Sequence, residues 1–317
     1  MGAVDTATVK LAAAATTALI AALGGSAAAT APTIAGCPVF PASNPWNTPV
    51  DKLSVAADSA TLIASIGLSS GVHADFGSGL YDGSRIGIPF VVVHGRSTPK
   101  SRVSFEYADE SDKGPYPIPA NVPVEGAPAH TNSGDRHVLI VDRDSCKLYE
   151  LSGMQRTAGH WAGWSGAIWS LRSNAVRPAT WTSADAAGLP ILPGLARWEG
   201  DASTGKINHA LRFTVERTRR AFIYPARHYA SSSTDPSLPP MGLRVRLKAS
   251  VDISRLPRQA RIVAQAMKTY GLILADNGSN WYVSGAPSPH WSNDQLHALG
   301  ALTGADFEVV DTSKLRP

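Results

Sequence analysis

The sequence predicts a mainly β protein, an antiparallel β-sandwich of the jelly-roll or concanavalin type with a few accessory α-helices. Short apolar segments recur along the chain, and each is bounded by Gly, Pro, Asn, Asp or Ser, as in strands joined by turns. Two of the links, residues 143–145 and 216–219, are too short for the crossover that parallel strands need. Neighbouring strands are therefore expected to form antiparallel hairpins.

The elements are expected in the following order along the chain. A short amphipathic helix is predicted at residues 58–66. Strands are predicted at residues 88–94, 102–108, 136–142, 147–151, 165–171, 208–215, 220–226 and 242–249. A longer helix at 257–270 begins at Pro257 and ends before Gly271, and a shorter helix follows at 293–299.

Composition places the chain among folded globular proteins. Of its 317 residues 44% are hydrophobic and only 17% are charged, which excludes a disordered chain. Neither an internal repeat nor a linker marks a boundary, so residues 30–317 are expected to form one domain. The net charge is +4, but the longest basic cluster holds only Arg217, Arg219 and Arg220. Nucleic acid is therefore not an expected partner.

The N-terminus reads as a secretory signal peptide over residues 1–29. An alanine-rich apolar run at 11–23 follows Lys10 and is too short to span a bilayer. The small residues at 27–29 offer a cleavage site near Ala29. The mature chain is therefore expected to be secreted, without an integral membrane segment.

The chain has two cysteines, Cys37 and Cys146. In an oxidising compartment an even number of cysteines favours one long-range disulfide. The alternative is a lipoprotein, because residues 34–37 resemble a lipobox that ends at Cys37. The apolar run stops well before Cys37, which favours the disulfide.

Polar side chains are most concentrated between residues 208 and 229, on two strands expected to be adjacent. The candidates for proton transfer are His209, Tyr224 and His228, and Arg212 and Arg227 are candidates for binding substrate hydroxyls or a uronate. The alternative is that these are hydrogen-bonded residues of an ordinary hairpin.

Two carboxylates complete the candidate catalytic set. Glycoside hydrolysis ordinarily uses a pair of carboxyl groups, one as proton donor and one as base or nucleophile. Asp185 and Asp276 are favoured because each occurs in a segment that contains Gly and aromatic residues. The alternative for the segment around Asp276 is a simple tight turn.

Tryptophans provide candidate surfaces on which sugar rings could stack. Trp164, Trp181 and Trp281 are predicted to bind substrate in this way, with residues 159–166 as a flexible rim. The alternative is burial in the interior, which is common for Trp in a sandwich.

Other chemistries have little support in the sequence. Residues 163–167 approach a nucleophile elbow but carry Ala where the last Gly belongs. The chain has no His-Glu-x-x-His motif, no cysteine pair at zinc spacing and no phosphate-binding glycine loop. No metal ligand set and no cofactor is therefore predicted.

Three segments carry a resemblance. Residues 181–190, 207–228 and 275–279 are similar to an uncharacterised group of secreted bacterial proteins, and the resemblance covers most of residues 44–311. It implies export and a single compact unit. It implies no activity and no catalytic residue.

These observations together predict a secreted enzyme that acts on a polysaccharide or oligosaccharide, most simply a monomeric glycoside hydrolase. A polysaccharide lyase is the first alternative, with Tyr224, His209 or His228 abstracting the proton beside a uronate that Arg212 or Arg227 neutralises. A non-catalytic carbohydrate-binding protein is the second.

Overall fold

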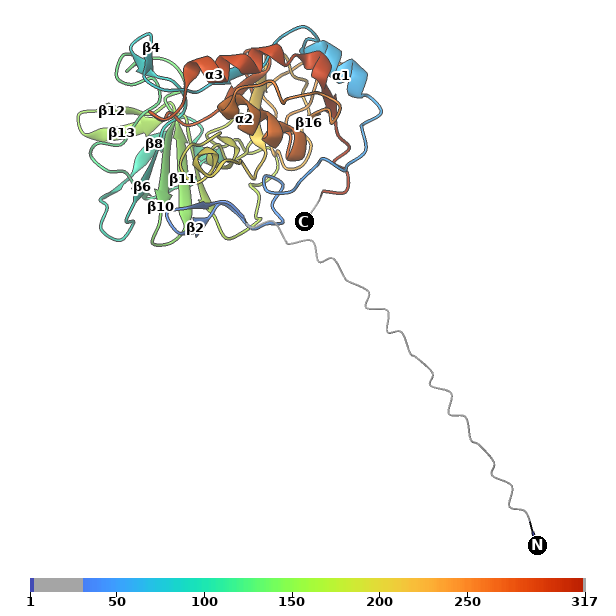
Figure 1. Ribbon diagram of the computed structural model, residues 1–317. Helices are drawn as coiled ribbons and strands as arrows, with labels where there is room; N and C mark the ends of the chain where they lie inside the picture. The colour runs from blue at the N-terminus through green and yellow to red at the C-terminus, as the bar shows by residue number, and fades with distance from the viewer. Residues whose placement is uncertain (3–30, 316–317) are drawn as a thin grey trace.

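The computed structural model describes residues 1–2 and 31–315 (Figure 1). The predicted signal peptide therefore lies outside the described residues, apart from its first two. The fold is mainly β, with two principal sheets and three short α-helices, as the sequence predicts. Strands β6, β10 and β11 lie on one side of the molecule, and the helices lie toward the other side, beside β16 (Figure 1).

The first principal sheet has four strands in the order β14-β11-β10-β6. The bounds are Phe90–Val93 for β6, Val138–Asp142 for β10, Lys147–Ser152 for β11 and Ser165–Ser170 for β14. The β10–β11 hairpin and the β11–β14 pair are antiparallel, whereas β6 pairs with β10 in parallel. The predicted hairpin at residues 143–145 is thus confirmed.

The second principal sheet has six strands in the order β19-β16-β17-β15-β18-β3. The bounds are His73–Asp75 for β3, Leu211–Val215 for β15, Arg244–Leu247 for β16, Leu272–Asn277 for β17, Tyr282–Ser284 for β18 and Phe307–Val309 for β19. This sheet is mixed as well, because β15 is parallel to β17 and antiparallel to β18.

Smaller sheets and helices surround these two. A three-stranded sheet joins β8 (Val103–Phe105), β12 (Gln155–Thr157) and β13 (His160–Gly163). The two-stranded pairs are β1 (Thr33–Ile34) with β2 (Cys37–Pro38), β4 (Leu80–Tyr81) with β5 (Ser84–Arg85), and β7 (Lys100–Ser101) with β9 (Tyr116–Pro117). The α-helices are α1 (Ser59–Ile66), α2 (Arg258–Thr269) and α3 (Asn293–His297), and the 3₁₀ turns are Ala108–Glu110, Leu192–Gly194, Ala202–Thr204, Ala298–Ala301 and Gly304–Asp306.

The predicted strand at 220–226 is wrong, and so is the hairpin at 216–219. This segment forms a single parallel bridge, between Phe222 and Met241, and no strand. Pro225 lies in its middle and has no backbone N–H to donate to a ladder. Strand β15 pairs instead with β17 and β18, which come some sixty residues later in the chain.

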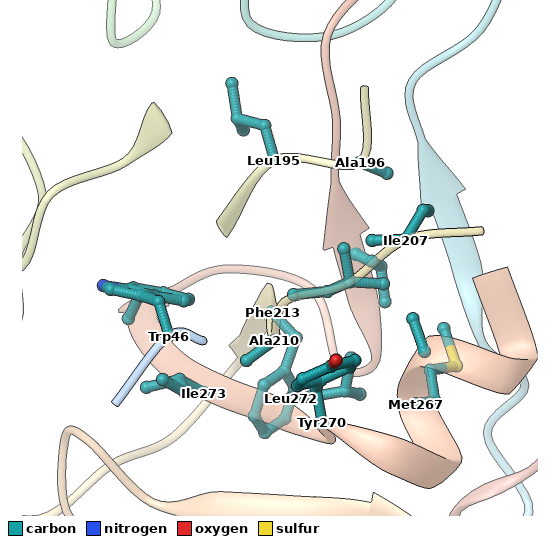
Figure 2. Packing of buried hydrophobic residues seen from close by; sticks show 14 of the residues in the cluster. Trp46, Leu195, Ala196, Ile207, Ala210, Phe213, Met267, Tyr270, Leu272 and Ile273 are labelled. Atoms are coloured by element: carbon teal, nitrogen blue, oxygen red, sulfur yellow. The ribbon is translucent and has the colours of Figure 1, made fainter. Parts of the chain in front are cut away.

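One hydrophobic cluster runs through both principal sheets and the helices. Figure 2 shows part of it, with Met267 of α2 in the same cluster as Ile207, Phe213 and Leu272. Strand β10 is buried on both faces, because Leu139 belongs to this cluster and Ile140 to a second cluster on the other side of the sheet. That double burial explains why β10 reads as a continuous apolar run.

The segment from Ser183 to Arg197 crosses the interior between the two principal sheets, and a buried carboxylate holds it. Glu150 of β11 is fully buried and accepts hydrogen bonds from the backbone N–H groups of Ile191 (3.0 Å) and Leu192 (2.8 Å) and from Trp169 Nε1 (3.2 Å). Burial raises the pKa of Glu150 to about 7, against the lowering effect of these donors. Because each of these partners donates, the site accommodates the carboxylate form.

Cys37 and Cys146 form the predicted disulfide, with an S–S distance of 2.01 Å. It ties β2 to the turn between β10 and β11, across 109 residues of sequence. No thiol is left at Cys37 for the lipid that the lipobox alternative requires. Among the described residues, no helix is long and apolar enough to cross a membrane.

Replacing Cys37 and Cys146 together with Ala should lower the free energy of unfolding by about 2–5 kcal/mol, because the unfolded chain loses a long closed loop. Urea denaturation of the variant and the wild type measures the difference. The wild type under reducing conditions is the control and should behave like the variant. Equal stability of all three forms would contradict the assignment.

Candidate functional site

A row of polar side chains lies on one face of the six-stranded sheet. Thr214 of β15 pairs in register with Asp276 of β17, and Ser284 of β18 pairs with Asp75 of β3. Because paired residues share a face, and residues two apart along a strand do too, Arg212 of β15 belongs to the same row. Four neighbouring strands therefore bring two carboxyl groups, two hydroxyls and a guanidinium together.

Arg212 is the centre of this row. Its Nε and Nη2 donate to the two carboxylate oxygens of Asp185, each at 2.8 Å. Its Nη1 donates to Ser284 Oγ at 2.7 Å, and Nη2 also donates to Asp276 Oδ2 at 3.1 Å. Burial would lower the pKa of Arg212, but Asp185, with smaller effects of Asp276 and Glu125, outweighs burial and raises it, so the guanidinium stays charged. The side chain of Asp185 is completely buried, which makes this a desolvated bidentate ion pair.

Asp276 keeps partial contact with solvent. Its side chain is 22% exposed. Burial and then the negative charge of Asp185 raise its pKa to about 7, against the opposing effect of Arg212. Since both acids hydrogen-bond to the same Arg212 nitrogen, the nearest oxygens of Asp185 and Asp276 are less than about 6 Å apart. Asp276 is thus an accessible carboxyl that can hold a proton near neutral pH.

A histidine that sequence reasoning missed lies close by. His137 immediately precedes β10 and is buried. Its Nδ1 lies 2.5 Å from Glu125 Oε2, and its Nε2 lies 3.0 Å from the Ala184 carbonyl oxygen. Both ring nitrogens face acceptors, so both carry hydrogen and His137 is an imidazolium. Burial would lower the pKa of His137, but Glu125 raises it to about 9.

Glu125 and Asp135 lie on the solvent side of this histidine. Burial would raise the pKa of Glu125, but the charge of His137, its hydrogen bonds and the charge of Arg212 together outweigh burial and lower it. Ligand atoms of Glu125, Asp135 and His137 all lie within 4.8 Å of one another, a spacing that a metal ion could use. Both nitrogens of His137 are already donors, however, and a metal needs a free lone pair. The geometry fits an ion pair with an exposed carboxylate beside it.

Asp75 also belongs to this electrostatic cluster. Its side chain is exposed, yet desolvation raises its pKa, so protein atoms lie close around it. The charges of His73, Glu125 and Arg212 act on it as well. The ring of His73 stacks on Tyr282 with a centroid separation of 4.2 Å. We call Asp75, Glu125, Asp135, Asp185 and Asp276 the carboxylate cluster.

His228 lies beside the same segment that carries Asp185. Its Nδ1 is 2.7 Å from the Ala186 carbonyl oxygen, which can only accept. In the neutral ring this contact puts the proton on Nδ1 and leaves the lone pair on Nε2. The backbone N–H of Ala187 donates to the Ala275 carbonyl, so this segment connects His228 to the strand that carries Asp276.

Two of the predicted site residues, His209 and Trp281, are enclosed in the interior. His209 is buried, and its Nε2 lies 3.2 Å from Asp201, which also pairs with Arg197. Burial and then the charge of Arg197 lower the pKa of His209, so the ring is neutral and enclosed. Trp281 has no exposed surface and stacks between Phe213 and Phe307. A residue with no solvent contact cannot bind a sugar.

The remaining predicted residues lie elsewhere and stay predictions. Tyr224 is half-buried beside other cavities, and Arg227 Nε donates to the Arg177 carbonyl at 2.9 Å. Trp164 is 41% exposed, between strands β13 and β14. The predicted flexible rim at 159–166 consists largely of these two strands. Trp181 is half-buried, with the Arg177 guanidinium 5.4 Å from its ring centre.

The sequence carried a partial signal for the residues that were missed. His137 directly precedes the apolar run of β10. A polar side chain at the end of a buried strand is a position where a site residue can be expected. Asp75 and Glu125 carried no such signal, because β3 has only three residues and Glu125 lies outside any strand. A cavity of about 430 Å³ lies between Thr33 and Phe90 and is lined by no member of the carboxylate cluster.

The chain matches no protein-family model, no curated protein and no solved structure.

Asp185→Asn should lower the pKa of Asp276. The change removes a neighbouring negative charge and leaves Asp276 as the remaining anionic partner of Arg212, and both effects favour the carboxylate. Titration of the Asp276 carboxyl carbon by NMR measures the shift, with Asp294→Asn, an exposed carboxyl on α3, as the control. An unchanged titration of Asp276 in the Asp185 variant would show that the two groups are not coupled.

The His137–Glu125 pair should make stability fall with rising pH above neutrality. The pKa of His137 is about 9 in the folded protein against a usual 6.5, so its stabilising effect is complete below 6.5 and is lost as pH rises through 9. Between pH 7.5 and 9 the free energy of unfolding should fall by up to about 1.4 kcal/mol per pH unit.

Urea denaturation across this pH range measures that slope. Asp276 and Glu150, with pKa values of about 7, contribute mainly below it. The His137→Gln variant should be less stable and lack the slope. A variant with the same slope as the wild type would disprove the assignment of His137 as a cation.

Proposed function

We propose that this protein is a secreted glycoside hydrolase in which Asp276 is the general acid. The observation that carries the proposal is the state of Asp276, an accessible carboxyl with a pKa of about 7 among other carboxylates. Two carboxyl groups whose environments hold them in different protonation states are what acid and base catalysis of glycoside hydrolysis requires.

Asp135 is the proposed base. It is exposed, and its charge is one of the influences that raise the pKa of Asp276, so the two groups are near each other. In the proposed reaction Asp276 gives its proton to the glycosidic oxygen as the bond from that oxygen to the anomeric carbon breaks. Asp135 takes a proton from the water whose oxygen bonds to the anomeric carbon. The products are a hemiacetal and an alcohol. Asp276 has lost one proton and Asp135 has gained one.

The buried groups have supporting roles in this proposal. Arg212 positions Asp276, and Asp185 fixes Arg212 through two hydrogen bonds. His137 and Glu125 form the ion pair beside Asp135. His228, with its lone pair at Nε2, is available for a hydrogen bond to a substrate hydroxyl.

The lyase alternative loses its anion-binding group. Arg212 is buried, and four of its five N–H donors are engaged by Asp185, Asp276 and Ser284, so it is poorly placed to neutralise a substrate uronate. Arg227, the other candidate, donates to a backbone carbonyl. The proposed substrate is therefore a neutral or mixed polysaccharide or oligosaccharide. The proposed enzyme acts on it as a monomer.

The test is incubation of the mature chain with a panel of neutral and acidic polysaccharides, following reducing ends and the ultraviolet absorbance of unsaturated uronates. We expect new reducing ends without absorbance. Asp276→Asn and Asp135→Asn should each lower kcat by about 100- to 10,000-fold. For the wild type, kcat/KM should fall as pH rises through about 7, where Asp276 loses its proton.

Asp294→Asn, which removes an exposed carboxyl on α3, is the matched control and should retain wild-type kcat. Reducing ends accompanied by absorbance would establish a lyase and overturn the proposal. Full activity in both the Asp276 and Asp135 variants would overturn the assignment of the acid and base. Binding without turnover across the panel would favour a carbohydrate-binding protein.

A further inference from the structure

A small cavity lies beside Trp181, on the loop that leads to Asp185. Its volume is about 180 Å³, and Trp169, Arg177 and Trp181 line it together with Asp112 and Ser170. Pockets for drug-sized ligands measure about 300–1,000 Å³, so this cavity suits a single ring. Its lining combines aromatic faces with hydroxyl and carboxylate oxygens.

Arg177 holds the aromatic part of this cavity rigid. Its guanidinium carbon lies 5.7 Å from the ring centre of Trp169 and 5.4 Å from that of Trp181. Its nitrogens donate to Asp112 Oδ2 at 2.7 Å and to the carbonyl oxygens of Thr182 and Glu110 at 2.6 and 2.5 Å. The side chain is 5% exposed. Because each of its three nitrogens already donates to an acceptor and its side chain is buried, the Arg177 guanidinium is fixed in place and can orient the indole rings.

The polar lining suits hydroxyl groups. The carboxylate of Asp112 is 36% exposed, and one of its oxygens is taken by Arg177 and by the backbone N–H of Ile168. Its other oxygen is an acceptor for a sugar hydroxyl, and the exposed hydroxyl of Ser170 can donate or accept. The negative charge of Asp112 would repel a uronate carboxylate.

We infer that this cavity is a binding subsite for one neutral sugar ring, which stacks on Trp181 and hydrogen-bonds to Asp112 and Ser170. The inference rests on the proposed function and specifies its substrate as a glycan that presents an uncharged ring at this subsite. Apolar ring faces with hydroxyls at the edge match an aromatic platform with a polar rim.

The subsite is within reach of the carboxylate cluster. Trp181 and Asp185 are four residues apart, and an extended chain covers at most about 3.5 Å per residue, so their Cα atoms are within about 14 Å. Asp185 in turn hydrogen-bonds to the same Arg212 nitrogen as Asp276. The distance from the subsite to Asp276 is therefore one that an oligosaccharide of a few rings spans.

The test measures binding separately from cleavage. The Asp276→Asn chain is titrated by calorimetry with neutral cello-, xylo-, malto- and arabino-oligosaccharides and with oligogalacturonate. We expect at least one neutral ligand to bind and oligogalacturonate to bind more weakly. Adding Trp181→Ala should weaken the neutral ligand about tenfold or more, which corresponds to about 1.4 kcal/mol of stacking. Trp181→Phe, which keeps a ring, should recover most of that loss.

Two further variants keep the test decisive. Ser170→Trp fills the cavity from its exposed rim while Trp181 itself is retained, and it should also abolish binding. Tyr81→Ala removes a 78% exposed aromatic ring on the β4–β5 hairpin and should leave affinity unchanged. Unaltered affinity in both the Trp181→Ala and Ser170→Trp variants would overturn the subsite, as would a preference for oligogalacturonate.

The two proposals fail separately. If neutral ligands bind at Trp181 but the wild type never cleaves them, the proposed hydrolase function is overturned and the subsite stands. Cleavage by the wild type that is unaffected by Trp181→Ala and Ser170→Trp, in both kcat and KM, would leave the hydrolase in place and remove the subsite.

Discussion

The buried ion pair between Arg212 and Asp185 is the interaction on which the rest of the candidate site depends. It joins the segment that crosses the interior to the centre of the six-stranded sheet. The attraction within a buried ion pair offsets the cost of desolvating both charges only when the geometry is nearly ideal. Here both oxygens of Asp185 accept hydrogen bonds from two nitrogens of Arg212. Burial of Asp276 and the charge of Asp185 together outweigh the stabilisation that Arg212 gives to the ionised form of Asp276.

The local parts of the fold could be predicted from the sequence, and the long-range parts could not. Helix α2 followed from its apolar stripe and from Pro257 and Gly271 at its ends, and β10 followed from its apolar run. Strand β17 was missed, because six residues that directly follow a helix and end at an Asn-Gly pair read equally well as a loop. Strands β3 and β18 have three residues each, too few to show a periodicity.

The same limit explains what was found of the site. Asp185, Arg212 and Asp276 were candidates by residue type, and the structure brings them together through pairing between segments about sixty residues apart. His209 carried the same polar signal as Arg212, yet it precedes the strand and turns into the interior toward Asp201. The sequence therefore predicts which side-chain types the site contains, but it does not predict which residue each side chain contacts.

The segment between Ser183 and Arg197 has a consequence for how this sequence can vary. A connection between two sheets ordinarily runs over the surface and tolerates changes in length. Here Glu150 fixes it at Ile191 and Leu192, Arg212 fixes it at Asp185, and a backbone bridge fixes Ala196 to Gly285. An inserted residue would shift at least one of these three attachments out of register, so this connection should be as intolerant of insertions as a central strand.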